Sequence, residues 1–115
     1  KNKKWYNSSF YIKNINHFNK SKNKTCFIVS NDIFENGLYI RRWKYGDKIY
    51  SATSKKHTLV SDIFINNKLS RYDKLVQPIV VDQADIIVWI PGIMHAKSEG
   101  EYDTKKLKLL EWETA

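Results

Sequence analysis

The sequence contains little of what marks a secreted, membrane-bound or metal-holding protein. Cys26 is the only cysteine in 115 residues, so the chain has neither a disulfide framework nor a thiol pair for zinc. No run approaches the roughly 18 apolar residues of a membrane span, and the lysine-rich start lacks the apolar segment of a signal peptide. These absences predict a cytoplasmic protein without a membrane partner.

Catalytic motifs are missing as well. The four glycines form neither G-x-G-x-x-G nor G-x-x-x-x-G-K-[ST], which excludes the common nucleotide-binding loops. Nucleophilic catalysis needs a nucleophile, a base and an orienting group, yet Cys26 lies inside the apolar run TCFIV, where a buried structural side chain is expected. His17, His57 and His95 are scattered along the chain. We therefore expect no catalytic residue, no cofactor-binding residue and no metal ligand here.

Positive charge is abundant but regional. The formal net charge is +8. Residues 1–24 carry seven lysines and no acid, and residues 41–74 carry nine Lys or Arg against three Asp, whereas residues 75–104 hold one lysine and five acids. A regional excess of this kind is expected of a nucleic-acid-binding surface, although a merely solubilising charge would give the same composition.

Local patterns predict an α+β fold built on a mostly antiparallel, sandwich-like sheet with one or two short helices. We expect the first strand to be an edge strand or an ordered arm, and the strand pair after residue 77 to be a buried hairpin. β-favouring or alternating runs predict strands at residues 8–15, 24–32, 38–43, 48–52, 78–82, 85–92 and 105–112.

Two helices are predicted between the strands. Residues from about Thr58 to Asn66 place their apolar side chains on one helical face, and Ser70 with Asp73 forms a near capping box for a second, shorter helix. Lys55 and Lys56 precede the first helix, where the helix dipole already concentrates positive potential. A solvated loop, an internal carboxylate, or an anion from another molecule bound at the N–H groups of residues 58–61 would each explain this pair.

The strand at residues 38–43 contains two adjacent arginines. Arg41 and Arg42 should point to opposite faces, so only one of them faces a given surface, and the other is expected to pair internally with Asp47. Trp43 and Tyr45 are expected to pack in the core or at its rim, and stacking on a base or ribose is the alternative.

These residues resemble a known family. The segment LYIRRWKYGDKIYSATSKKHTLVSDIFINNKLSRYDKLVQPIVVDQADIIVWIPGI, residues 38–93, is similar to the C-terminal domain of bacterial tRNA(Ile)-lysidine synthetase, TilS, and residues 105–112 look like the closing strand of that domain. The signature is an ordered set: an Arg-rich strand, a Gly-Asp pair, a Lys-Lys pair, a Ser-Asp-x-Phe-Ile helix and a Trp-x-Pro-Gly hairpin. Its members here are Arg41, Arg42, Gly46, Asp47, Lys55, Lys56, Ser61, Asp62, Phe64, Ile65, Lys68, Trp89, Pro91 and Gly92.

The resemblance implies a parent enzyme that uses ATP, with Mg²⁺, to attach lysine to the wobble cytidine of tRNA(Ile) with a CAU anticodon. Its catalytic domain lies N-terminal in the same polypeptide and bears a Ser-Gly-Gly-x-Asp-Ser loop that this chain lacks. In the family, this C-terminal domain, which is similar to a domain of the phenylalanyl-tRNA synthetase β subunit, contacts the acceptor-stem side of the tRNA. Residues 1–36 would then be a basic linker or arm with leading strands, and residues 37–115 the tRNA-binding domain.

Three functions remain to be compared. The first is noncatalytic RNA binding through the basic side chains. The second is an interdomain, protein–protein or homodimerisation module whose lysines only solubilise it, and the third is an independent small enzyme, for which none of the expected roles is filled. For the first, the candidate RNA-binding residues are Arg41, Arg42, Lys48, Lys55, Lys56, Lys68 and Arg71.

Overall fold

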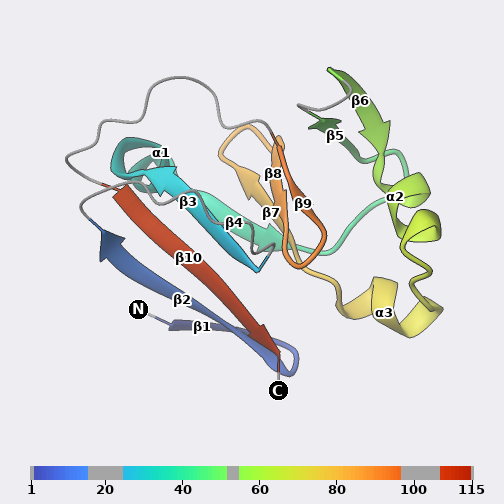
Figure 1. The fold of residues 1–115 in the computed structure, drawn as a ribbon, viewed down its shortest axis with the longest axis horizontal. Helices are drawn as coiled ribbons and strands as arrows, with labels where there is room; N and C mark the ends of the chain where they lie inside the picture. The colour runs from blue at the N-terminus through green and yellow to red at the C-terminus, as the bar shows by residue number, and fades with distance from the viewer. Residues whose placement is uncertain (1, 16–24, 52–54, 97–106, 115) are drawn as a thin grey trace.

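Antiparallel strands dominate the computed structural model, which describes residues 2–15, 25–51, 55–96 and 107–114 (Figure 1). Within these residues the strands form two four-stranded sheets and a two-stranded hairpin, and three short helices lie between them. Side chains of the two larger sheets share one buried apolar cluster. The predicted α+β, sandwich-like architecture is therefore confirmed, with one helix more than expected.

The first sheet joins the two ends of the chain. Its order is β1-β2-β10-β3. β2 pairs with β10 over eight consecutive positions, so β2 is an inner strand and the expectation of an edge strand or arm at residues 8–15 is wrong. The long strand β10 covers the edge that β2 would otherwise expose. The strands are β1 (Asn2–Trp5), β2 (Ser8–Ile15), β3 (Cys26–Ser30) and β10 (Leu107–Thr114).

The second sheet has the order β4-β7-β8-β9, and its central strands β7 and β8 are buried on both faces. Val80 and Trp89 pack toward the first sheet, against Phe10 and Phe27, while Ile79 belongs to a second apolar cluster on the opposite face. Burial on both faces explains why these strands are apolar without alternation. The strands are β4 (Leu38–Arg41), β7 (Ile79–Asp82), β8 (Ile87–Ile90) and β9 (Met94–His95), and the predicted buried hairpin corresponds to β7 and β8.

The second apolar cluster is closed by β5 (Lys48–Ser51), β6 (Lys56–Leu59) and helix α2 (Val60–Asn66). The amphipathic helix is confirmed, since Val60, Ile63 and Phe64 are buried. It begins two residues later than predicted, because the chain from Lys56 to Leu59 pairs with β5 as a strand.

Two further helices are each one turn or slightly longer. Helix α3 (Arg71–Val76) has the predicted capping box, in which the Ser70 side chain accepts from the backbone N–H of Asp73 and the Asp73 carboxylate accepts from that of Ser70. Helix α1 (Asn31–Asn36) was not predicted; the strand expected over residues 24–32 stops at Ser30. The Asn36-Gly37 turn signal marks the end of α1, where Gly37 adopts a φ of 113°.

Two glycines in left-handed backbone conformations allow a matched test of packing between the sheets. Gly92 (φ 80°) faces Trp112, and an added Cβ would lie 2.9 Å from Trp112 Cζ3, whereas a Cβ at Gly46 (φ 94°) meets nothing within 4 Å. Gly46→Ala should lower the free energy of unfolding by about 1 kcal/mol through backbone strain alone. Gly92→Ala should cost about 2 to 3 kcal/mol, since the indole must also move. Urea unfolding measures both, and equal losses would contradict this account.

Candidate nucleic-acid interface

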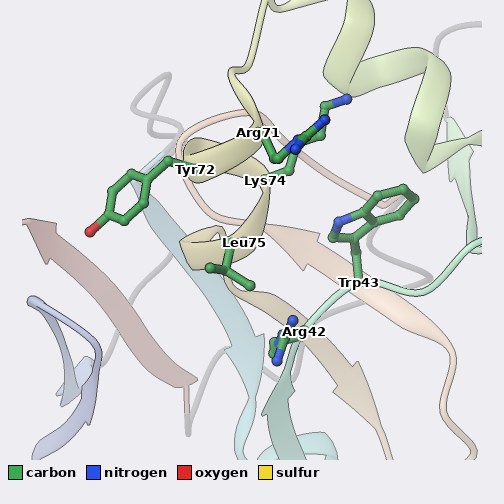
Figure 2. A pocket seen from close by; sticks show the side chains of 6 residues that line it. All are labelled: Arg42, Trp43, Arg71, Tyr72, Lys74 and Leu75. Atoms are coloured by element: carbon green, nitrogen blue, oxygen red, sulfur yellow. The ribbon is translucent and has the colours of Figure 1, made fainter.

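A cationic hollow of about 740 Å³ opens between helix α3 and the segment that follows β4 (Figure 2). The side chains that line it combine three cations with apolar and aromatic groups, and no carboxylate is among them. They are Arg42, Trp43, Arg71, Tyr72, Lys74 and Leu75. Two of them, Arg42 and Arg71, belong to the seven candidate residues, so the fold brings together positions separated by 28 residues of sequence.

Helix α3 is held at its ends rather than by its sides. None of its residues is buried, and a six-residue helix is too short to be stable alone. Its first turn is closed by the capping box. At its last turn, the indole Nε1 of Trp5 donates to the carbonyl of Val76 (2.8 Å), and just beyond it the buried amide of Gln77 donates to the carbonyl of Pro91 (2.8 Å). Anchored in this way, the helix leaves most of its side chains available to a ligand.

Arg41 is the arginine that pairs internally, as the alternation predicted. Its guanidinium donates two hydrogen bonds to the Asp47 carboxylate (both 3.0 Å), while its Nε donates to Asp85 (2.8 Å). Asp47 also accepts from the backbone N–H of Lys44 (2.6 Å). We call Arg41, Asp47 and Asp85 the arginine clamp. It makes Arg41 an unsuitable RNA-binding residue, and it leaves the exposed Arg42 as the one that lines the hollow.

The clamp shifts the pKa values of both carboxyl groups downward. Burial opposes the ionisation of Asp47, but the hydrogen bonds from Arg41 and the Lys44 N–H, together with the Arg41 charge, bring its pKa below the usual 3.8. The hydrogen bond from Arg41 also lowers the pKa of Asp85. Both groups are therefore ionised near neutral pH, and the clamp is a fully charged network.

The lysine pair does not stand at a helix start. Lys55 occupies the turn before β6 with a φ of 55°, and Lys56 is the first residue of that strand. The backbone N–H of Val60, the first residue of α2, donates to the carbonyl of Asp47 (2.9 Å). Of the N–H groups of residues 58–61 that the sequence suggested for a phosphate, that of Val60 is therefore already used, and a phosphate site at this backbone stays a prediction. A role for both lysines in binding RNA stays a prediction.

The pairing of β5 with β6 places the two lysines of this hairpin, Lys48 and Lys56, on different faces. Lys48 pairs with Leu59, and Ser51 pairs with Lys56. Since side chains alternate along a strand, Lys48 and Lys56 project from opposite faces of the hairpin. Both are exposed, but a single flat ligand cannot contact both.

Lys68 follows helix α2 in a left-handed conformation, with a φ of 56°. Glycine or asparagine usually occupies this position after a helix, and a lysine there costs about 1 kcal/mol. Lys55 shares this feature. Two exposed cations thus occupy backbone positions that favour glycine, which suggests that these side chains serve something other than folding.

Most of the elements that carry candidate residues follow one side of the molecule. Figure 1 shows the β5–β6 hairpin, α2 and α3 in succession along that side, away from β1 and β2. Lys74 also lines the hollow but was absent from the predicted set. It lies three residues after Arg71, and this i, i+3 spacing on a helix could have predicted that the two side chains share a face.

Of the two aromatic candidates, Trp43 packs edge-on against Phe64, with ring centroids 5.4 Å apart. Tyr45 is 93% exposed, so the expectation of core or rim packing holds for Trp43 and is wrong for Tyr45.

The expectation that Cys26 is buried is also wrong. Its side chain is only half-buried and lies beside Glu111.

Other site classes find little support in the part of the chain that the structure describes. No group of three or more His, Cys, Asp or Glu side chains there is placed to hold a metal ion. No helix within these residues has the length and apolarity to cross a membrane. His17 lies outside the described residues, while His57 and His95 are exposed, on β6 and β9.

Sequence comparison agrees with the resemblance noted above. No family model matches the chain. The tRNA(Ile)-lysidine synthase of Bacillus subtilis (strain 168) is 39% identical over 67 residues, which is 58% of this chain and 14% of that protein. The enzymes named tRNA(Ile)-lysidine synthase from Shouchella clausii (33% over 60 residues, 52% and 13%) and Thermotoga maritima (29% over 75 residues, 65% and 17%) also match. The matched part spans less than a fifth of these relatives.

Structural comparison gives the fold. A crystal structure of the TilS C-terminal domain superposes with a TM-score of 0.83 at 21% identity, covering 94% of this chain and 85% of that one. The chain therefore has the α+β fold of that domain. Over 52 to 65% of its length the chain is also similar in sequence to the tRNA(Ile)-lysidine synthases named above.

The arginine clamp predicts that the two adjacent arginines differ in their effect on stability. Arg41→Met should lower the free energy of unfolding by about 2 kcal/mol, because it leaves the mostly buried Asp47 carboxylate without its charged donor. Arg42→Met, the matched control on the opposite face, should change it by less than about 0.5 kcal/mol. Urea unfolding of both variants measures these changes, and equal changes in the free energy of unfolding would mean that the clamp contributes nothing to stability.

The clamp also predicts how stability depends on pH. Because the folded-state pKa of Asp47 is depressed, its contribution is fully present above the unfolded pKa of about 3.8 and is lost as pH falls through the lower folded value. Asp47→Asn should be less stable near neutral pH and should lose less stability between about pH 5 and pH 2 than the unaltered chain. Unfolding free energies measured across that range test this, and parallel pH profiles would refute it.

Proposed function

We propose that this chain is the tRNA-binding part of a tRNA(Ile)-lysidine synthase and carries no catalytic residue of its own. The whole cytoplasmic enzyme would use ATP and Mg²⁺ to attach lysine to the wobble cytidine of tRNA(Ile) with a CAU anticodon. A catalytic domain in the same polypeptide would supply that chemistry. The names of the relatives support this role, and the short share of their length that the chain matches supports the division of labour.

The observation that carries the proposal is the cationic hollow with no acid in its lining. Arginine grips phosphate through two parallel hydrogen bonds and lysine acts as a point charge, so Arg42, Arg71 and Lys74 together suit an RNA backbone. In most basic surfaces carboxylates are interspersed and weaken such binding. Here the nearest acidic side chain of α3, Asp73, is turned to the helix start by the capping box.

The succession of basic elements along one side favours a double-stranded partner. A-form RNA hides its major groove, so proteins contact its phosphates and ribose hydroxyls and read its shape. Cations on β6, on the turn after α2 and on α3 would follow such a backbone, and the acceptor-stem side of the tRNA is the double-stranded segment that we propose. Lys55, Lys56 and Lys68 would then extend the contact that begins at the hollow.

Binding to tRNA(Ile) should depend on where positive charge is removed. Arg42→Ala with Arg71→Ala should weaken binding by about 1 to 3 kcal/mol and reduce the slope of log affinity against log salt by about 1 to 2, because fewer counterions are released. Lys55→Ala with Lys56→Ala should act in the same direction. Fluorescence anisotropy at several salt concentrations measures both quantities.

The matched control is Lys3→Ala with Lys4→Ala, which removes the same charge from exposed positions of β1 in the first sheet. Its effect should be small. If this control weakens binding as much as the hollow variant does, affinity follows net charge alone and the assignment of the site is wrong.

A specific feature keeps the interaction-module hypothesis in view: Ile65 and Ile86 are large apolar side chains that are more than half exposed. A dimerisation module would self-associate and bind tRNA poorly. Sedimentation of the chain over a range of concentrations separates the two roles, since a monomer that binds tRNA would exclude dimerisation as the function.

A further inference from the structure

We propose that the cationic hollow takes an unpaired nucleotide, with its base against Trp43 and its phosphate on the surrounding cations. This inference rests on the proposed RNA-binding function and deepens it. Binding of an RNA backbone would use the three cations of the hollow but not its apolar lining. That lining includes the ring of Trp43 and the side chain of Leu75.

The indole of Trp43 is positioned before any ligand arrives. Its edge-to-face contact with the fully buried Phe64, at an interplanar angle of 75°, fixes the plane of the ring from the core side. A base that stacks on a ring already held in place pays little additional ordering entropy. Stacking on aromatic side chains is the usual way in which proteins hold single-stranded bases.

The cations stand where the phosphate of such a nucleotide would lie. Figure 2 shows the charged ends of Arg71 and Lys74 on the same side of α3 as the indole of Trp43, while Tyr72 points away from it. Arg42 approaches from the segment after β4. Leu75, 39% exposed, adds an apolar side chain beside these charges. The hollow therefore combines a stacking surface with an anion-binding rim.

A duplex cannot use this combination. Between its ends its bases are paired and stacked on one another, so there it presents phosphates and ribose but no free base face. The apolar lining would stay uncovered against a continuous stem, and Trp43 would contribute nothing to affinity. An unpaired nucleotide at the end of a stem, or one bulged from it, covers both the apolar lining and the cations.

The test compares two RNAs that share one 12-base-pair stem, one blunt and one with an unpaired four-nucleotide 3′ extension. We expect the extended RNA to bind the 115-residue chain at least about fivefold more tightly than the blunt one, because one base gains a stacking partner. Trp43→Leu, which keeps an apolar side chain against Phe64, should reduce that preference to less than about twofold.

A second variant guards against loss of folding at Trp43. Leu75→Glu places a carboxylate in the hollow on a side chain that is not buried, so it should abolish the preference without unfolding the chain, as circular dichroism would verify. The matched control is Ile65→Glu, which puts the same charge at an exposed position on α2, outside the hollow. It should retain the preference.

The outcomes separate this inference from the function on which it rests. Equal binding of blunt and extended RNA, or a preference that survives both hollow variants, overturns the nucleotide site and leaves backbone binding intact. If neither RNA binds, the proposed function fails as well.

Discussion

The arginine clamp is the interaction on which the rest of the candidate interface depends. Arg41 ends β4 and ties the turn at residues 44–47 to the turn between β7 and β8. Asp47, one of the two carboxylates of the clamp, also accepts through its backbone carbonyl from the N–H of Val60, the first residue of α2. One ion-pair network thus positions a strand end, two turns and a helix start. Because its carboxylate partners are already engaged with Arg41, the next arginine is left for a ligand.

The domain uses charge in two different ways. In the clamp, one arginine pairs with two carboxylates in a partly buried setting, where each hydrogen bond supports the position of the chain. In the hollow, cations from two segments gather without an acid, which is unfavourable for the isolated domain and useful only with an anion bound. The short helix α3 makes this possible, because capping at one end and side-chain hydrogen bonds at the other hold it without burying its sides.

Sequence reasoning succeeded where the signal was local. The capping box at Ser70, the buried hairpin of β7 and β8 and the opposite directions of Arg41 and Arg42 all follow from spacing within a few residues. It failed where a distant partner decided. The chain before α2 continues as strand because β5 is there to pair with it, and β2 is an inner strand because β10 returns to it from residues 107–114. Helix α1 was not predicted either, because its short apolar pattern is equally compatible with a strand.

By itself, the sequence determined the class of fold, the resemblance to tRNA(Ile)-lysidine synthases and the kind of chemistry that the surface offers, since these depend on composition, on alternation along single elements and on an ordered set of motif residues. Only the tertiary structure decided which cations act together. It assigned Arg41 to the clamp, brought Arg42 into one hollow with Arg71 and Lys74, and placed Lys48 and Lys56 on opposite faces. The physical reason is that a charge has its effect through distance and direction in space, and pairing between remote strands sets both.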